Sequence, residues 1–414
     1  MSVLLFAPVT FNLAETTRMI EVAKALRDRH ECVFLGYEPD FSHFIIDAGF
    51  TFHQLQPVWN ELEKARALAL DQGRGVRNPF TVDLVRRRVA AERRLIRETA
   101  AVAVVHGTNV TSLISARAEG IPLFYPVPFA LTRPHVEQTK HGLFAIPGWV
   151  EPVVMPAFRA LYNTAPLVPR AFKIAARENS KRPLRSMASM FEADYNLLTV
   201  MPWELEGYSL PSNYERVGPI FAHLPGELPD VVHDLASSPR PLVYLALGSS
   251  ASRRLALGTL RSLGKLPINV VAPVAHYLTD GDRKEVPANV TVTGLLPAHR
   301  LGGLVDAAVL HGGQGTVQTA CATGVPFVGM GLQPEQRWNV AVCERRGNAT
   351  ALRPRQVGTP TFARSVRTAI EDSGMRDAAT RTKLAYACEN GAIAAASAIA
   401  RVLASPNPRD FEAP

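Results

Sequence analysis

The stretch Asp306-Ala-Ala-Val-Leu-His-Gly-Gly-Gln-Gly-Thr316 decides how the second half of this chain folds. Four apolar residues run into a segment with three glycines, and a helix-forming run follows, which predicts a buried strand, a tight turn and a helix start. Such a helix start leaves backbone N–H groups without intrahelical partners, and these groups bind anions. The segment has neither the Lys-Ser/Thr pair of a P-loop nor G-x-G-x-x-G spacing. It therefore predicts a phosphate site, with a plain helix-starting turn as the alternative.

Strand-like and helix-like segments alternate on both sides of this stretch. In the second half, apolar runs of strand length lie at 241–250, 268–272, 290–293, 307–311 and 326–330. In the first half, strands are expected at 2–8, 31–36, 101–105 and 121–127, with helices at 15–29 and 109–119. This alternation is typical of βαβ units, which build parallel sheets. The sequence therefore predicts an α/β fold in both halves.

Chain length sets the expected number of domains. The chain has 414 residues, and a single hydrophobic core stops growing beyond roughly 250 to 300 residues. We expect an N-terminal domain over residues 1–223, a linker over 224–240, a C-terminal domain over 241–390, and a C-terminal helix and tail over 391–414. Repeated prolines between residues 134 and 185 predict an insertion of helix-prone pieces in the first domain.

Composition predicts a cytoplasmic protein without a metal. The chain has no run of about 20 apolar residues, and its first residues lack the basic and long apolar regions of a signal peptide. The cysteines at positions 32, 321, 343 and 388 form no zinc-binding pattern with histidine, so we expect them to be reduced. The net charge of +8 favours anionic partners.

Three sequence pieces carry a resemblance to a known family. They are His311-Gly-Gly-x-Gly-Thr-x-x-x-Ala320, Gly324-Val-Pro326 and Pro334-Glu-Gln-x-x-Asn339, and in this order they resemble the donor signature of family 1 glycosyltransferases. The resemblance extends to Leu247–Ser250 and Val292–Ala298. It implies the GT-B fold, in which two Rossmann-like domains face each other across a cleft.

The resemblance also implies roles for residues of the donor site. The side chain of His311 would bind the diphosphate of a nucleotide sugar. Four backbone amides would bind it as well, those of Gly313, Gln314, Gly315 and Thr316. Glu335 and Gln336 would hold sugar hydroxyls, because a carboxylate accepts hydrogen bonds and an amide both donates and accepts them. Ser249 and Ser250 would contact phosphate, and the backbone of Leu296 to Ala298 would pair with the base. Ordinary turn and helix-start chemistry is the alternative for each of these pairs.

The N-terminal half departs from the family pattern at the expected catalytic position. Family members usually carry a histidine there as general base, and the register of the following helix places Glu15 at this position. The family's helper aspartate follows the fourth strand, where this chain offers His106 with Gly107. Because a carboxylate with a raised pKa can act as a base, we hypothesise that the family's histidine and aspartate have changed places here. Glu15 and His106 would then form the catalytic pair at strand ends that face the cleft. The alternatives are an acidic residue that favours the helix dipole and an ordinary turn histidine.

The resemblance as a whole implies an inverting hexosyltransferase. It would move a hexose from a UDP- or dTDP-sugar to a hydroxyl of a small molecule or lipid, and it would need neither a metal nor a cofactor beyond this co-substrate. Two alternatives remain open: a sugar-nucleotide 2-epimerase on the same fold, and a catalytically silent sugar-nucleotide-binding partner or activator of another enzyme.

Basic residues gather in two segments of the N-terminal half. They are Arg86, Arg87, Arg88, Arg93, Arg94 and Arg97 in the first, and Lys173, Arg177, Lys181, Arg182 and Arg185 in the second. They would contact an anionic acceptor or a phospholipid surface, which would place the protein peripherally at the inner membrane face, while solvated helix faces are the alternative. Aromatic residues do not interleave with these charges, so the pattern does not favour nucleic acid.

Overall fold

The structure is a computed structural model that describes residues 1–71, 75, 78–130, 132–139, 150–164, 167–179 and 183–405. The chain divides into two compact units, with Met1–Ile220 and Asn390–Pro414 in unit 1 and Phe221–Glu389 in unit 2. The segment 224–240, expected as a linker, contains a helix, α9 (Asp230–Ala236), and lies in unit 2. The expected C-terminal helix, α16 (Gly391–Ala404), lies in unit 1.

Unit 1 is built on a parallel sheet with the strand order β3-β2-β1-β4-β5-β6-β7. Its strands are β1 (Ser2–Ala7), β2 (His30–Gly36), β3 (Thr51–Gln54), β4 (Ala103–His106), β5 (Leu123–Val127), β6 (Tyr195–Leu198) and β7 (Tyr214–Arg216). Every residue of β4 and β5 is buried, because helices cover both faces of such a sheet. The strands expected from the sequence in this half correspond to β1, β2, β4 and β5.

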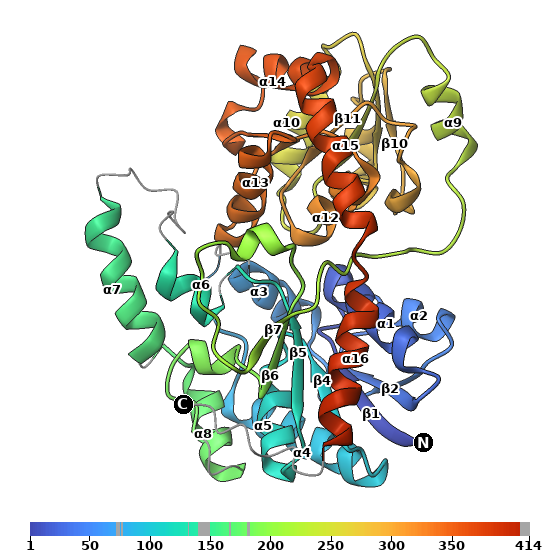
Figure 1. Ribbon diagram of the computed structural model, residues 1–414. Coiled ribbons are helices and arrows are strands. Elements are labelled where there is room, and N and C mark those ends of the chain that lie inside the picture. Colours follow the sequence, from blue (N-terminus) through green and yellow to red (C-terminus); the bar gives the residue numbers. More distant parts are fainter. Residues whose placement is uncertain are drawn as a thin grey trace. The chain divides into compact units, whose positions relative to one another are not determined.

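Helices surround this sheet (Figure 1). Besides α16 they are α1 (Leu13–Leu26), α2 (Ser42–Asp47), α3 (Glu61–Asp71), α4 (Val82–Glu98), α5 (Val110–Glu119), α6 (Arg133–Gln138), α7 (Glu151–Thr164) and α8 (Arg170–Asn179), with short 3-10 turns η1 (Ala188–Met190) and η2 (Pro202–Leu205).

The helix α16 packs against α1 (Figure 1) and belongs to the unit 1 core. Ala395 and Ile399 are buried in the same hydrophobic cluster as Met19 and Leu26 of α1. At the start of α16, a Cβ on Gly391 would lie 2.3 Å from the backbone oxygen of Gly218, so this close approach requires glycine. The end of the chain thus stabilises the N-terminal unit.

The proline-rich insertion at 134–185 is helical over most of its described part. Pro156 lies inside α7 and removes one backbone N–H from the helix. The helix continues past this proline, and Met155 and Tyr162 on its inner side are buried in a small core with Val136 of α6. Apolar burial therefore offsets the lost hydrogen bond.

Unit 2 has a second parallel sheet, with the order β10-β9-β8-β11-β12-β13. Its strands are β8 (Leu242–Ala246), β9 (Asn269–Ala272), β10 (Val290–Val292), β11 (Ala307–Leu310), β12 (Phe327–Gly329) and β13 (Ala349–Ala351). Besides α9, its helices are α10 (Arg253–Leu263), α11 (Asp280–Arg283), α12 (Gln314–Thr323), α13 (Pro334–Arg346), α14 (Pro360–Glu371) and α15 (Ser373–Ala387), with 3-10 turns η3 (Ala275–Tyr277), η4 (Ala298–Arg300) and η5 (Pro354–Gln356). The predicted α/β class is confirmed in both units.

Both sheets reverse their strand order at an equivalent point. The order reverses between β1 and β4 in unit 1, and between β8 and β11 in unit 2. Ligands of open α/β sheets bind outside the carboxyl ends of the strands at such a point. These strands lead into the segments that carry the residues singled out from the sequence, namely Glu15, His106, Ser249 and His311.

The described part of the chain contains no helix long and apolar enough to cross a membrane. All four cysteines are free. The Sγ atoms of Cys321 and Cys343 nevertheless lie 3.7 Å apart in the interior of unit 2, where α12 and α13 meet.

Candidate functional site

The glycine-rich stretch of unit 2 forms a tight turn between β11 and α12. Gly312 has a φ of +90°, and a Cβ at this position would lie 2.7 Å from the backbone oxygen of Gln336. Both the positive φ and the close approach of α13 therefore require glycine. Gly313 then caps α12, which begins at Gln314. The predicted strand, turn and helix start are present.

The N-terminus of α12 leaves backbone N–H groups at its open end. The first N–H that bonds within the helix is that of Val317, which donates to the backbone oxygen of Gly313 at 3.1 Å. The N–H groups of Gly315 and Thr316 precede it, and both residues are half-buried. Such a turn carries partial positive charge and binds anions. The Thr316 hydroxyl donates to the Gly313 oxygen at 2.9 Å and keeps its lone pairs for a ligand.

His311 lies between this turn and the end of β8. Its Nδ1 is 3.3 Å from the backbone oxygen of Ala246, and burial lowers its pKa to about 4, so the ring is neutral at pH 7. A proton on Nδ1 that faces this carbonyl leaves Nε2 as an acceptor. A Cβ on Gly313 would lie 2.4 Å from Nε2, so glycine keeps this edge of the ring clear.

The start of α13 is tied to the glycine turn by side-chain hydrogen bonds. Asn339 Nδ2 donates to the backbone oxygen of Gly312 at 3.0 Å and to Glu335 Oε1 at 2.7 Å. Asn339 therefore orients the carboxylate of Glu335, which is half-buried.

Gln336, in contrast, turns inward. It is 2% exposed, its Oε1 accepts from the Leu332 N–H at 3.0 Å, and its Nε2 donates to Ser250 Oγ and to Gln333 Oε1, both at 3.0 Å. Its amide thus caps α13 and fixes the Ser250 loop. The geometry gives Gln336 a positioning role and leaves Glu335 as the more open member of the pair predicted to hold sugar hydroxyls.

The loop after β8 is anchored by two residues that the sequence analysis did not single out. Tyr277 Oη donates to the Gly248 oxygen at 2.6 Å and accepts from the Ala251 N–H at 3.2 Å, while His276 Nε2 lies 3.3 Å from the same Gly248 oxygen. The exposed Ser249 lies between these anchors. His276 and Tyr277 follow β9 at the same sheet edge, and that position was the available signal.

The stretch predicted to face the base forms a local turn. The Ala298 N–H donates to the Leu296 oxygen at 2.8 Å, and Leu296 is buried. The side chain of Leu295 is 52% exposed. Backbone pairing with a base through the Ala298 N–H would compete with this local bond, whereas Leu295 offers an apolar surface.

One acidic triplet in unit 2, Asp280-Gly281-Asp282, has the D-x-D spacing found in metal-dependent transferases. Asp282 is engaged with Arg253 Nε at 2.7 Å and with the backbone and hydroxyl of Thr279, whose hydrogen bonds cap α11. These donors lower the pKa of Asp282, Arg253 first. Among the described residues, no group of three or more metal-ligating side chains occurs.

In unit 1, the carboxylate of Glu15 connects the segments that follow β1 and β4. Oε1 accepts from the Val9 N–H at 2.6 Å, and Oε2 accepts from the Thr108 hydroxyl at 2.8 Å, while the Thr108 N–H lies 3.2 Å from both oxygens. Glu15 is 5% exposed. Burial raises its pKa above the usual value, and the hydrogen bonds from Val9 and Thr108 and the charge of Arg18 oppose this rise.

Gly107 makes room for this carboxylate. A Cβ on Gly107 would lie 1.9 Å from Glu15 Oε1. The carboxyl group of Glu15 therefore occupies the space that any side chain at position 107 would fill. A carboxylate is thus present at the end of β4, but it is supplied by α1.

His106 does not pair with Glu15 in the structure. Its ring lies 4.6 Å, centroid to centroid, from that of Tyr125, and its two nitrogens have no hydrogen-bond partner of normal geometry in the described part of the chain. It is 1% exposed, and burial lowers its pKa to about 3. Thr108, not His106, is the side chain that holds Glu15.

Most basic residues of α4 form ion pairs with acidic residues of unit 1. Arg88 is buried with Glu38 at 2.8 Å, Arg93 and Arg97 bind Glu119 of α5 at 2.6 and 2.7 Å, and Arg86 donates to Glu178 of α8 at 2.8 Å. Lys181 and Arg182 lie outside the described residues.

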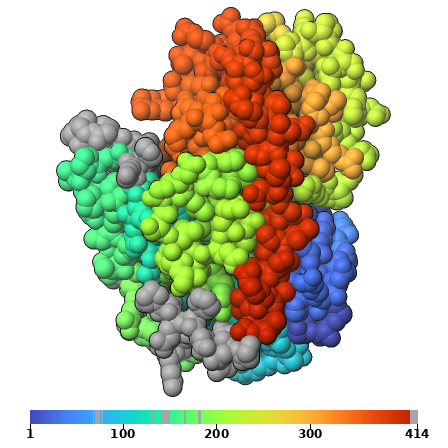
Figure 2. All heavy atoms as spheres, in the orientation of Figure 1, coloured from blue at the N-terminus to red at the C-terminus, as the bar shows by residue number. Residues whose placement is uncertain are grey.

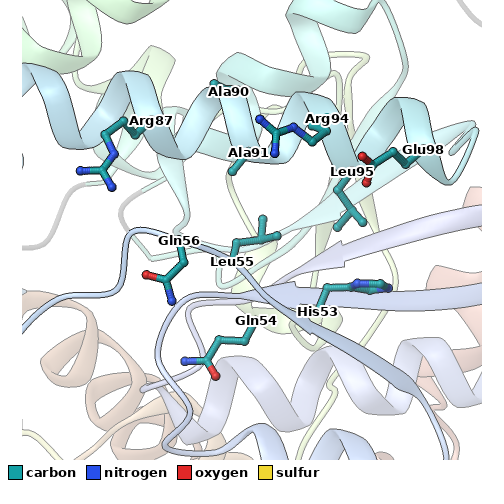
Figure 3. A pocket seen from close by; sticks show the side chains of 10 residues that line it. All are labelled: His53, Gln54, Leu55, Gln56, Arg87, Ala90, Ala91, Arg94, Leu95 and Glu98. Atoms are coloured by element: carbon teal, nitrogen blue, oxygen red, sulfur yellow. The ribbon is translucent and has the colours of Figure 1, made fainter.

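A surface hollow of about 480 Å³ lies between α4 and the end of β3 (Figure 3). It is lined by His53, Gln54, Leu55, Gln56, Arg87, Ala90, Ala91, Arg94, Leu95 and Glu98. None of the predicted donor or catalytic residues lines it.

Comparisons with known proteins place this chain among sugar-transferring enzymes. Residues 258–399 match the family described as Erythromycin biosynthesis protein CIII-like, C-terminal domain. The chain is 27% identical over 394 residues to a PGL/p-HBAD biosynthesis glycosyltransferase of Mycobacterium tuberculosis, covering 92% of this chain and 88% of the relative. It is 31% identical over 208 residues to 4'-demethylrebeccamycin synthase of Lentzea aerocolonigenes, covering 50% of this chain and 49% of that protein. The solved structure of the glycosyltransferase VinC in complex with dTDP aligns with 97% of this chain and 99% of VinC, with a TM-score of 0.66 and 19% identity.

The two parallel-sheet units, the family match and these relatives together support one class. The chain is a glycosyltransferase with the GT-B fold, and its second half is similar to the Erythromycin biosynthesis protein CIII-like family.

Proposed function

We propose that this enzyme transfers a hexose from a UDP- or dTDP-sugar to a hydroxyl group of a lipid or natural-product acceptor, with inversion and without a metal ion. The observation that carries the proposal is the N-terminus of α12, where the N–H groups of Gly315 and Thr316 lie next to His311 at a sheet switch point. The dTDP bound to VinC supports the nucleotide, and the names of the glycolipid and rebeccamycin relatives support the acceptor class.

The donor site would stabilise the departing nucleotide diphosphate by fixed dipoles. Each well-placed N–H donor contributes about 3 kcal/mol to such stabilisation. His311 is neutral in the free enzyme, with Nε2 unprotonated when Nδ1–H faces Ala246. A diphosphate beside Nε2 would raise the pKa of the ring, so donor binding would take up a proton and His311 would then donate to the diphosphate.

Glu15 would act as the general base toward the acceptor. Burial and the bonds from Val9 and Thr108 hold its carboxylate in one orientation at the carboxyl end of β1. In the step, the acceptor hydroxyl gives its proton to Glu15 as its oxygen bonds to the anomeric carbon. The bond from that carbon to the diphosphate breaks on the opposite side, and the diphosphate keeps the electron pair.

His106 enters this proposal as a positioning residue. With a pKa of about 3, the buried ring is neutral at pH 7 and is too weak a base to take a proton from the acceptor. Its packing against Tyr125 would support the backbone that places Thr108 next to Glu15.

The test begins with a thermal-shift screen of UDP- and dTDP-hexoses to find the donor. The best donor is then incubated with a phenolic glycolipid precursor or an aglycone in EDTA, and NMR determines the anomeric configuration of the product. The proposal expects an inverted glycoside, undiminished by EDTA, and no change to the donor alone. A C2-epimerised sugar without acceptor would favour an epimerase instead, and donor binding without turnover on any acceptor would favour a silent partner.

A further inference from the structure

Helix α7 presents an apolar face that no described element covers. Its exposed residues recur at helical spacing and carry no charge. They are Pro152, Val153, Pro156, Ala157, Ala160, Leu161 and, at the last position, the polar Thr164. Val153 is 76% exposed and Leu161 45% exposed. In Figure 2, the blue-green spheres of α7 lie at the outer margin of unit 1. The stripe runs along almost the whole helix.

The charged residues of α7 do not interrupt this stripe. The helix has two, Glu151 at its first position and Arg159 in its middle, and both are half-buried. Arg159 turns inward and donates to the backbone oxygens of Val136 at 3.0 Å and Thr139 at 2.6 Å. A surface helix normally places its charges on the solvated side. Here the cation is used inside, and the outer side is apolar.

Cations lie next to this stripe in the sequence. Leu167, 46% exposed, is followed by Arg170 and Arg177, which are seven positions apart and therefore on one face of α8. Both arginines are exposed, and neither has an ion pair within the described ranges. The acid of α8, Glu178, is held by Arg86 of α4. In Figure 1, α7 and α8 lie on the same side of unit 1. That side therefore carries both the apolar stripe and two exposed arginines, on a chain of net charge +8.

We propose that α7 and the exposed face of α8 form a docking surface for an anionic phospholipid bilayer. Apolar side chains of an interfacial helix enter the headgroup region, while neighbouring arginines bind anionic headgroups. We name the residues Val153, Leu161, Leu167, Arg170 and Arg177 the α7–α8 surface. Such a contact would hold the enzyme at the membrane surface and would leave the donor site of unit 2 unaltered.

Vesicle flotation tests this surface. Full-length protein is mixed with vesicles of phosphatidylcholine alone or with about 30% phosphatidylglycerol, a fraction that gives the membrane a strongly negative surface potential. We expect at least tenfold tighter binding to the anionic vesicles, weakened by salt. The double variants Val153→Asp/Leu161→Asp and Arg170→Glu/Arg177→Glu should each lose at least tenfold in binding. Leu384→Asp, at a position 64% exposed on α15 of unit 2, is the matched control and should bind normally.

Thermal unfolding and dTDP or UDP binding check that each variant is folded, and Val153→Ser/Leu161→Ser replaces the aspartate pair if that pair does not fold. Absence of binding to anionic vesicles overturns the proposal, as does binding that both double variants leave unchanged. Light scattering decides the remaining case. If the wild type is a dimer and the aspartate pair makes it monomeric without affecting vesicle binding, the surface joins two copies of the chain and the proposal is wrong.

Discussion

Replacing Glu15 by glutamine separates its chemical role from its structural one. The carboxylate accepts bonds from the Val9 N–H at 2.6 Å and from the Thr108 hydroxyl at 2.8 Å, and the Thr108 N–H approaches both oxygens. The amide keeps one oxygen, most favourably toward Val9, and its NH2 group then faces Thr108. The hydroxyl of Thr108 can rotate to accept, but its N–H loses part of its partner.

The expected magnitudes follow from this geometry. Hydrogen bonds to a charged group contribute about 1.5 to 3 kcal/mol to stability, and neutral ones about 1 kcal/mol. The substitution also removes a buried charge, and the desolvation cost that this saves offsets part of the lost hydrogen-bond energy. We expect Glu15→Gln to lower the free energy of unfolding by about 1 to 2 kcal/mol. Loss of a general base lowers kcat by about 100-fold to 10,000-fold. The dissociation constant of UDP or dTDP should stay within about twofold, because the glycine turn that we propose to bind the nucleotide belongs to unit 2.

Urea unfolding, steady-state kinetics at saturating donor and calorimetric nucleotide titration measure these three quantities. Thr108→Val is the matched control, since it removes the hydroxyl bond to Glu15 but keeps the N–H and the carboxylate. It should cost similar stability and less than about tenfold in kcat, and Thr108→Ser should restore both. If Glu15→Gln retains kcat within about threefold, or if Thr108→Val loses as much activity, Glu15 is structural and the reasoning fails.

Three further predictions concern stability. Gly312→Ala should cost unit 2 about 3 kcal/mol or more by thermal unfolding, because strain at a φ of +90° adds to a 2.7 Å contact with the Gln336 oxygen. The control Gly226→Ala, with a φ of +94° and no atom within 4 Å, should cost only about 1 to 2 kcal/mol. Equal losses in the two variants would argue against the packing explanation. Gln336→Leu should cost about 2 kcal/mol in urea unfolding, since it removes the partners of Leu332 N–H and Ser250, and an unchanged midpoint would show that the buried amide does not hold them. Burial lowers the pKa of His106 to about 3 from an ordinary 6.5, so as pH falls the unfolded chain binds the proton first and stability decreases below about pH 6.5. The loss of stability at pH 5 is about 2 kcal/mol, and His106→Phe should remove it. If His106→Phe leaves the pH dependence of stability unaltered, His106 is not the group responsible.

The glycine turn after β11 was readable from the sequence because its constraints are local. A strand that ends in His311 and runs into glycines and a helix-forming segment leaves little choice of backbone, and the structure places Gly312 at positive φ as such a turn requires. Alternation of apolar runs likewise predicted the central strands of both sheets. β3, β6, β7 and β13 were not predicted, because short strands at or near a sheet edge often lack long apolar runs.

The details that depend on packing were not readable. Gln336 and Glu335 are neighbours in the sequence, and only the placement of α13 turns one inward and leaves the other more open. The bond between Glu15 and Thr108 spans 93 positions and exists because β1 pairs with β4, with Ala7 opposite His106. The sequence placed His106 near this point, but its ring packs against Tyr125 and makes no hydrogen bond to Glu15. Sequence periodicity contains no information on such contacts.

Calorimetric titration of UDP and dTDP into wild-type and Gly313→Ala protein, both in EDTA, tests whether the glycine turn of unit 2 binds a nucleotide diphosphate without a metal. Gly313 has a φ of −59°, which alanine adopts without strain. The three atoms nearest to the added methyl group all belong to the His311 ring, and its Nε2 would lie 2.4 Å away. We predict that at least one nucleotide binds in EDTA. Gly313→Ala should weaken this binding at least about tenfold, while the displaced ring costs only about 1 to 3 kcal/mol of stability and the protein stays folded. Binding that requires a divalent metal, or an affinity that Gly313→Ala leaves unchanged, would contradict this prediction.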